Sequence, residues 1–181
     1  MQIIDIKSLL NYIAKGGQPK YLFFWGHKHK DDNVTKACFS QWFESSFKED
    51  GISFKTAEHY MMYQKAVLFG DKDISKKVIV ATNPGAAKAL GRQIKKFDND
   101  IWLQHRFEIV INANVLKFSQ NKELKEFLLK TKDRVLVEAS PVDNIWGIGL
   151  AADNINSQNP YNWKGPNLLG FALMVVRDKL I

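Results

Sequence analysis

The hydrophobic pattern of residues 56–69 predicts a single helix enclosed in the protein. Thr56 is a favoured N-cap residue, Glu58 falls in the first turn, where the helix dipole stabilises a negative charge, and Gly70 ends the helix. Alanine, aliphatic, methionine and aromatic side chains occupy nearly every side of this segment, which is typical of a buried helix. The pattern therefore places charged residues in the interior, where unpaired charge is costly.

Two of these charges fall on one face of the predicted helix. Glu58 and Lys65 are seven positions apart. At about 100° per residue this is roughly two turns, so the two side chains share a face about 10 Å apart along the axis. Two interpretations stay open. Either both charges have ion-pair partners elsewhere and the neighbouring side chains are core, or Glu58 and Lys65 line a pocket and act on a ligand.

Apolar spacing, capping residues and turn residues predict the other elements. We expect an amphipathic N-terminal helix over 1–17 and further helices over 71–81, 84–91, 98–118, 122–129 and 168–180, the last capped by Asn167. We expect short strands over 21–26, 51–54 and 134–138, and an irregular loop over 151–165. Strands and helices do not alternate regularly, which argues against a Rossmann-type sheet. The predicted fold is a mainly helical α+β single domain, with a few short strands, over residues 1–181.

Composition supports a folded globular chain. Hydrophobic residues make up 45% and aromatic residues 12% of the 181 positions. The single cysteine, Cys38, excludes an internal disulfide and fits a reducing compartment. No apolar run reaches the roughly 18 residues of a membrane span, and the polar N-terminal segment does not resemble a signal peptide. We therefore expect a cytoplasmic protein with no membrane partner.

The formal net charge of +7 favours an anionic partner, such as nucleic acid, a nucleotide or a phosphorylated metabolite. The polar loop 27–35 holds His27, His29, Asp31 and Asp32, but no second cluster has metal-ligand spacing. We expect no metal and no cofactor.

Common catalytic and phosphate-binding fingerprints are missing, including a Walker loop, a dinucleotide-binding loop, a G-x-S-x-G elbow and an H-E-x-x-H pair. Polar residues instead lie in an aromatic context: Trp25, Glu58, His59, Lys65, Arg92, Trp102, Asp143, Asn144, Trp146 and Asn167. Such a set suits a base and a sugar, because rings stack on the base, carboxylates act as acid or base, and cations bind phosphate. Alternatively, the three tryptophans are core.

Six segments in order make the chain resemble the NADAR family (named for NAD and ADP-ribose), the YbiA-like N-glycosidases. They are Thr56-Ala-Glu-His-Tyr-Met-Met-Tyr-Gln-Lys65, Ala89-Leu-Gly-Arg92, Phe97-Asp98 with Trp102, Lys117-Phe-Ser-Gln120, Leu136-Val-Glu-Ala-Ser-Pro-Val-Asp143 with Trp146-Gly147, and Trp163-Lys-Gly-Pro-Asn-Leu-Leu-Gly170. The resemblance covers nearly the whole chain, from Phe24 to Arg177. It differs where shorter members read Trp-Gly-Asp-Gly, since this chain has Ile148 and then a longer loop with Asp153 and Asn154.

The resemblance implies an α+β enzyme that cuts a ribose N-glycosidic bond. One branch of the family hydrolyses phosphorylated ribosylamino-pyrimidine intermediates of riboflavin synthesis, and another removes ADP-ribose from guanine in nucleic acid. The expected catalytic residues are Glu58, Lys65 and Asp143. The expected substrate-binding residues are Trp25, Gly26, His59, Arg92, Trp102, Trp146, Gly147 and Asn167.

Each candidate has a chemical role to test. Cleavage builds positive charge at C1′, which the carboxylate of Glu58 stabilises while it activates water. Lys65 instead forms a Schiff base with the sugar if its pKa is lowered. Asp143 either protonates the leaving base or holds the ribose hydroxyls, Trp102 and Trp146 stack on the base, and Arg92 binds phosphate. The rival functions are a non-catalytic module that binds ADP-ribose or another NAD-derived nucleotide, and a basic nucleic-acid-binding protein without a small-molecule site.

Overall fold

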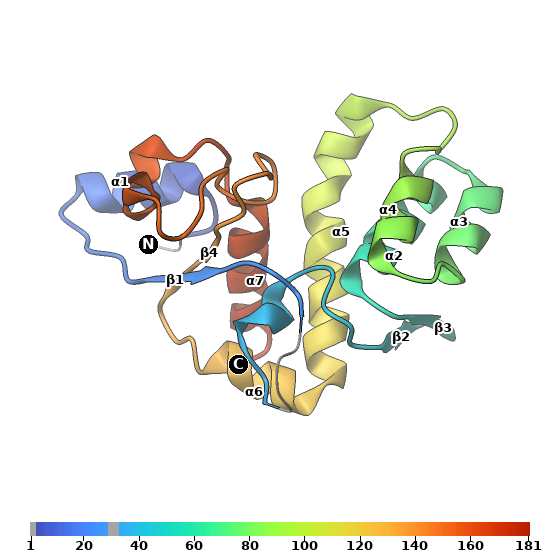
Figure 1. Ribbon diagram of the computed structural model, residues 1–181, viewed down its shortest axis with the longest axis horizontal. Helices are drawn as coiled ribbons and strands as arrows, with labels where there is room; N and C mark the ends of the chain where they lie inside the picture. The colour runs from blue at the N-terminus through green and yellow to red at the C-terminus, as the bar shows by residue number, and fades with distance from the viewer. Residues whose placement is uncertain (1–2, 29–32) are drawn as a thin grey trace. The chain divides into compact units, whose positions relative to one another are not determined.

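The computed structural model describes residues 3–28 and 33–181, and this part of the chain has the predicted mainly helical α+β fold (Figure 1). Its α-helices are α1 (Ile6–Ala14), α2 (Ala57–Leu68), α3 (Lys72–Ile79), α4 (Pro84–Gly91), α5 (Asn99–Gln120), α6 (Lys122–Leu129) and α7 (Leu168–Lys179). Its strands are β1 (Tyr21–Phe24), β2 (Phe47–Glu49), β3 (Ile52–Phe54) and β4 (Val135–Glu138). Three short 3₁₀ helices complete the set: η1 (Lys36–Phe39), η2 (Ile155–Gln158) and η3 (Pro160–Asn162). None of the described helices is both long enough and apolar enough to span a bilayer.

The described chain consists of two compact units. The single domain predicted over residues 1–181 stays a prediction. Gln41–Leu124 forms the central unit. The terminal unit combines the described residues up to Ser40 with Lys125–Ile181. The chain crosses from the central unit to the terminal unit within α6.

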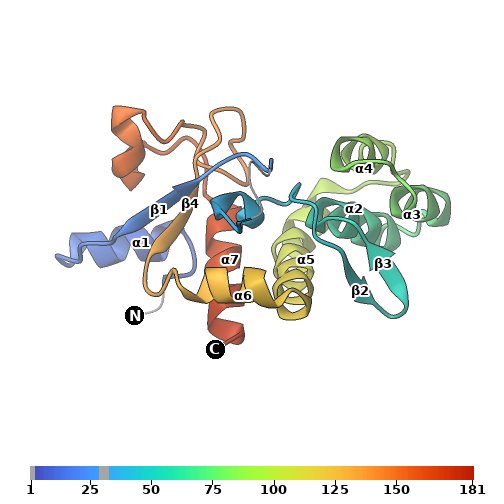
Figure 2. The same ribbon diagram turned by 60° about the horizontal axis from the view of Figure 1, so that its bottom comes forward.

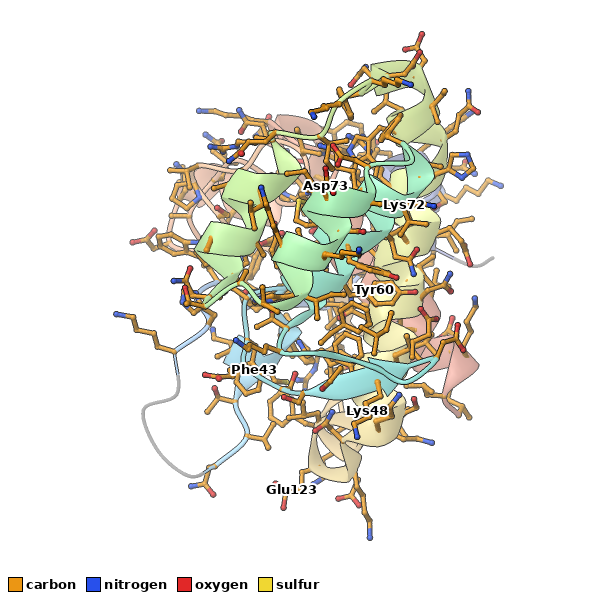
Figure 3. All side chains as sticks on the ribbon, turned by 90° about the vertical axis from the view of Figure 1, so that its right-hand side faces the viewer. Phe43, Lys48, Tyr60, Lys72, Asp73 and Glu123 are labelled. Atoms are coloured by element: carbon orange, nitrogen blue, oxygen red, sulfur yellow. The ribbon has the colours of Figure 1, made fainter. Side chains whose placement is uncertain are left out.

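A β-hairpin and four helices build the central unit. Strands β2 and β3 pair antiparallel, with Phe47 opposite Phe54. Both rings lie within 6.0 Å of the ring of Tyr60 on α2, and Ala113 of α5 completes this cluster. Figure 3 shows Tyr60 beside the hairpin, and its hydroxyl donates to a Glu49 carboxylate oxygen at 3.2 Å. The apolar face of a short hairpin is thus covered by α2 and α5, which it needs for stability.

Helix α2 begins and ends as its sequence predicts. Thr56 is the N-cap, and its hydroxyl accepts a hydrogen bond from the His59 amide at 3.3 Å. After the helix, Gly70 has a φ of +70°, the left-handed conformation that favours glycine. Burial is less uniform than predicted, because the first six residues are all buried whereas Val67, near the end, is 50% exposed.

The terminal unit contains a short parallel sheet. β1 runs beside β4, with Tyr21 opposite Val135 and Phe24 opposite Glu138 (Figure 2). Helix α7 packs against β4. The core of this sheet consists of four apolar residues that are each less than 2% exposed: Phe24, Val135, Leu136 and Val137.

The N-terminal helix is shorter than predicted. Asp5 is the N-cap of α1, because its carboxylate accepts from the Ser8 amide at 2.7 Å while the Ser8 hydroxyl accepts from the Asp5 amide at 3.1 Å. This capping box starts the helix at Ile6, so Ile3 precedes it and does not belong to its apolar face. Residues 1 and 2 lie outside the described residues.

Candidate functional site

Lys65 lies in a well-defined aromatic environment in the central unit. Its ammonium donates to the backbone carbonyl of Gly91 at 3.1 Å. The same Nζ lies 4.3 Å from the ring centroid of Phe97 and 5.3 Å from that of Trp102. Three segments therefore surround one amine: α2 supplies Lys65, the end of α4 supplies the carbonyl, and the start of α5 with the residue before its cap supplies the rings.

The electrostatic environment lowers the pKa of Lys65 below its ordinary value of 10.5. Burial of the amine is the largest cause, and the positive charge of Arg92 adds to it, whereas the negative charge of Glu58 acts in the opposite direction. Glu58 and Lys65 therefore interact, as their shared helix face predicts. A lysine with a lowered pKa holds a larger fraction of neutral amine, which is its nucleophilic form.

Glu58 is held in the first turn of α2. Glu58 is only 3% exposed, so its carboxylate lies inside the protein, as predicted. Its amide donates to the carbonyl of Gln41 at 2.9 Å, which satisfies one of the four N–H groups that a helix start leaves without a helical partner.

His59 and Arg92 differ in how they are placed. His59 is 1% exposed, with Nδ1 at 2.8 Å from the Thr56 hydroxyl and Nε2 at 3.3 Å from the Ala81 carbonyl. Both ring nitrogens are therefore used inside the central unit, which is a structural role; the predicted contact of His59 with substrate stays a prediction. Arg92 is the exposed C-cap residue of α4, and its positive charge lowers the pKa of Lys65.

Close packing of α4 on α2 fixes the carbonyl that Lys65 uses. A Cβ atom added to Gly91 would collide with the Met62 sulfur and come within 3.0 Å of Met62 Cγ. Glycine thus lets the Met62 side chain pack directly on α4 at the point where Lys65 crosses between the two helices, and any larger residue would displace that side chain.

The other catalytic candidate, Asp143, lies in the terminal unit, in the loop after β4. Its Oδ1 accepts from the Ile145 amide at 2.8 Å and from the Trp146 amide at 2.7 Å. The carboxylate thus shapes the turn that carries Trp146 and Gly147. A Cβ at Gly147 would lie 2.7 Å from the Glu138 carbonyl, so this turn also requires glycine against β4.

Asn167 occupies the predicted N-cap position of α7, but its side chain makes no cap hydrogen bond. Its backbone lies in the left-handed region, with φ 55°. Its buried amide instead accepts from the Glu138 amide at 2.9 Å and donates to the Leu136 carbonyl at 2.8 Å, so it pairs with β4 as a neighbouring strand would. The carbonyls of Gly147 and Trp146 take over the capping, because they accept from the amides of Asn167 and Leu169 at 3.3 and 3.0 Å.

The three tryptophans are not core residues, which was the alternative interpretation. Trp25 is 58% exposed, directly after β1 and before Gly26, whose φ of +83° turns the chain. Trp102 and Trp146 are half-buried. Trp25 is therefore largely open to solvent and the other two are partly so, and their stacking on a base stays a prediction.

Ile148 occupies the position at which this chain departs from the shorter family pattern. It is completely buried, its amide donates to the Glu138 carbonyl at 2.9 Å, and its carbonyl accepts from Lys164. The residue there is therefore part of the core of the terminal unit.

Metal binding finds no support among the described residues, since no three His, Cys, Asp or Glu side chains gather there as a possible site. His29, Asp31 and Asp32 of the loop considered above lie outside the described residues.

Sequence reasoning missed two features of the central unit. Phe97 provides the nearest ring to the Lys65 ammonium, and the Gly91 carbonyl provides its acceptor. Phe97 belongs to one of the six family segments, so an aromatic residue five positions before Trp102 was an available signal. A backbone carbonyl carries no sequence signal at all.

Comparison with known proteins gives concordant matches. The NADAR domain family model matches residues 23–181. An N-glycosidase of Acanthamoeba polyphaga mimivirus is 43% identical over 165 residues, which covers 88% of this chain and 96% of the relative. An N-glycosidase of Nostoc punctiforme is 34% identical over 143 residues, covering 79% of this chain and 85% of the relative.

The N-glycosidase YbiA of Escherichia coli is 31% identical over 150 residues, covering 83% of each chain. Its NMR structure matches with a TM-score of 0.71 and 29% identity, over 90% of this chain and 86% of that one. This match confirms the predicted YbiA-like α+β fold, and the names of the relatives agree with the predicted class of enzyme. With a family model over most of its length and relatives above 30% identity, this chain belongs to the NADAR domain family.

Proposed function

We propose that this protein is an N-glycosidase that hydrolyses the bond between a base and C1′ of ribose. The names of its relatives support this class of reaction. The observation that carries the proposal is Lys65, an amine with a lowered pKa that lies against two aromatic rings and interacts with the buried Glu58. Lysines whose pKa is lowered and that lie near a carboxylate are typical of covalent catalysis on sugars and carbonyls.

In the covalent route, the neutral Nζ of Lys65 attacks C1′, and the C1′–N bond to the base breaks with its electron pair. The base leaves with a proton from a carboxylic acid or water. The C1′–O4′ bond then opens as C1′=Nζ forms, and a proton passes from Nζ to O4′. Water adds to C1′, the C1′–Nζ bond breaks, and the free sugar and the amine are restored. Glu58 stabilises the positive charge that each step develops near C1′.

In the direct route, Glu58 removes a proton from water, and the water attacks C1′ as the base leaves. Lys65 then serves only as a positive charge for the sugar phosphate. The two routes differ in one observable, a covalent link between Lys65 and the sugar. Borohydride reduces a C=N bond to a stable secondary amine, so the covalent route predicts a mass increase on Lys65 in the presence of substrate, and an unmodified Lys65 supports direct hydrolysis.

For the substrate, we propose either a phosphorylated ribosylamino-pyrimidine of riboflavin synthesis or an ADP-ribosylated guanine in nucleic acid. The net charge of +7 and the exposed guanidinium of Arg92 near Lys65 support a phosphate-bearing substrate. They favour neither of the two over the other.

Mass spectrometry with both substrates tests the proposal. The protein is incubated with 5-amino-6-ribosylaminouracil 5′-phosphate and, separately, with an oligonucleotide ADP-ribosylated on guanine. Release of ribose 5-phosphate assigns the first substrate, and restored plain guanine assigns the second. Glu58→Gln and Lys65→Met are the controls, and both should lose turnover while they keep the wild-type melting temperature. If neither substrate reacts but ADP-ribose binds in calorimetry, the proposal is wrong and the protein is a binding module.

A further inference from the structure

A chain of hydrogen bonds runs from the backbone of α5 to the first turn of α2 within the central unit. The Asn114 side-chain amide donates to the Val110 carbonyl at 2.8 Å and to the Gln41 side-chain carbonyl at 2.7 Å. The backbone carbonyl of Gln41 then accepts from the Glu58 amide at 2.9 Å. One residue, Gln41, thus connects α5 through its side chain to Glu58 through its main chain.

The side chains of this connection are buried and polar, which makes them a poor choice for stability alone. Gln41 is 6% exposed and Asn114 is completely buried. Among the described residues, Gln41 Nε2 and Asn114 Oδ1 have no hydrogen-bond partner. A buried polar atom without a hydrogen bond destabilises the folded state by more than an ordinary hydrogen bond stabilises it. Two apolar side chains of similar shape would therefore be at least as stable here. The amide pair therefore needs a reason other than stability.

We propose that Gln41 and Asn114 are positioning residues that hold Glu58 in its catalytic orientation. The inference rests on the proposed function, because it assigns these residues to the carboxylate which that function uses. The Gln41 carbonyl closes one of the open N–H groups of the first turn of α2, and the turn carries the Glu58 side chain. Because Asn114 holds Gln41, the Gln41 carbonyl fixes the position of this turn relative to α5. A carbonyl in an unsupported loop would not fix it.

The same helix α5 also supports the other end of the pair. Trp102, near its start, lies over Lys65, and Asn114 lies 12 positions later, about 18 Å along the axis. Lys65 follows Glu58 on α2 by seven positions, so α2 and α5 run in opposite directions along this contact. One rigid helix therefore sets the positions of both Glu58 and Lys65, as a preorganised pair requires.

Two variants test the link at different points. Asn114→Leu keeps the size of the side chain and removes both of its bonds, and Gln41→Met removes the side-chain acceptor and keeps the backbone carbonyl. Asn121→Leu is the matched control. Asn121 also donates from its amide to the carbonyl four residues earlier, of Lys117 at 2.8 Å, and to a loop carbonyl, of Ser46 at 3.3 Å, but it does not lead to Glu58.

For both test variants we expect kcat to fall about 10- to 100-fold with KM within about twofold, because misplacing a catalytic group by about 1 Å costs roughly this much after binding. The melting temperature should stay at or above the wild-type value. This split between kcat and KM is the readout that a merely structural role of the two residues would not produce. Asn121→Leu should keep wild-type kinetics.

Hydrogen exchange gives a readout that does not depend on turnover. In Asn114→Leu and Gln41→Met the Glu58 amide should exchange about tenfold faster or more, while the amide of Met62 stays protected. If wild type has no glycosidase activity but this change occurs, the proposed function fails and the link between Asn114 and the α2 turn is real. The inference is overturned if the Glu58 amide exchanges at the wild-type rate or if kcat stays within twofold of wild type. It is also overturned if both variants fail to fold, because the amide pair is then a stability element.

Discussion

Gly91→Ala is the sharpest test of how α4 and α2 create the environment of Lys65. Gly91 ends α4, and its φ is not in the left-handed region, so alanine causes no backbone strain there. In a helix with open surroundings this substitution would stabilise the protein by about 0.5–1 kcal/mol. Here the new Cβ collides with the Met62 sulfur and approaches Met62 Cγ to 3.0 Å, so the sign should reverse.

The expected loss follows from overpacking. Forcing a methyl group into a packed contact costs about 1–3 kcal/mol. Subtracting the helix gain of about 0.5–1 kcal/mol leaves a net destabilisation centred on about 1 kcal/mol and at most about 2.5 kcal/mol. For a chain of 181 residues the central value lowers the melting temperature by roughly 2–4 °C. Either the Met62 side chain or α4 has to give way; a shift of α4 also takes the Gly91 carbonyl away from Lys65 and lowers turnover.

Urea and thermal unfolding of four proteins measure this effect: wild type, Gly91→Ala, Met62→Ala and the double variant. Met62→Ala alone should cost about 2–5 kcal/mol, and it should cost less by about 1 kcal/mol or more in the Gly91→Ala protein, because the collision is already relieved. Gly85→Ala in the same helix is the control, since its nearest contacts are Asn83 Oδ1 at 3.2 Å and the Trp42 ring at 3.6 Å. Wild-type stability of Gly91→Ala, or strict additivity of the two substitutions, would refute the reasoning.

Three further predictions concern charge. Arg92→Gln removes a positive charge that lowers the pKa of Lys65, so the alkaline rise of activity should move to higher pH; an unchanged pH–rate profile contradicts this. Asp143→Asn keeps an oxygen for its two loop bonds, so melting should be unchanged while turnover falls about 100-fold or more; wild-type turnover would exclude a catalytic acid there. Burial lowers the pKa of His59, so the unfolded state binds its proton first and the free energy of unfolding should fall below about pH 6.5. Titration of unfolding should show this loss in wild type and not in His59→Gln.

The helices were predictable because their signals are local. Asn83 with Pro84, Asp71 and Asp98 each mark a helix start by capping chemistry that acts within one turn, and the observed caps match them. Strand β2 was not predicted, because three residues are too few to show an alternating pattern. The helix over 1–17 was extended too far, because the pattern of isoleucines continues past the capping box that starts at Asp5. The two short 3₁₀ helices within 151–165 have no periodic signal either.

The candidate site was predictable in part for the same reason. That Glu58 and Lys65 share a face follows from helical geometry alone, and their interaction agrees with it. The partners of polar side chains far apart in sequence were not predictable. Asn167 bonds to β4 across 29 to 31 positions, and the link from Asn114 to Gln41 spans 73.

The sequence by itself determined the helices, their caps, the family and the residues that carry the proposed chemistry, because each depends on short spacing or on side-chain type. Only the tertiary structure decided how these residues are held. It placed the Lys65 amine between the Gly91 carbonyl and the rings of Phe97 and Trp102, and it gave His59 and Asn167 structural bonds. The physical reason is that a pKa depends on burial and on charges brought near by packing, and a hydrogen bond depends on distances that a linear pattern does not contain.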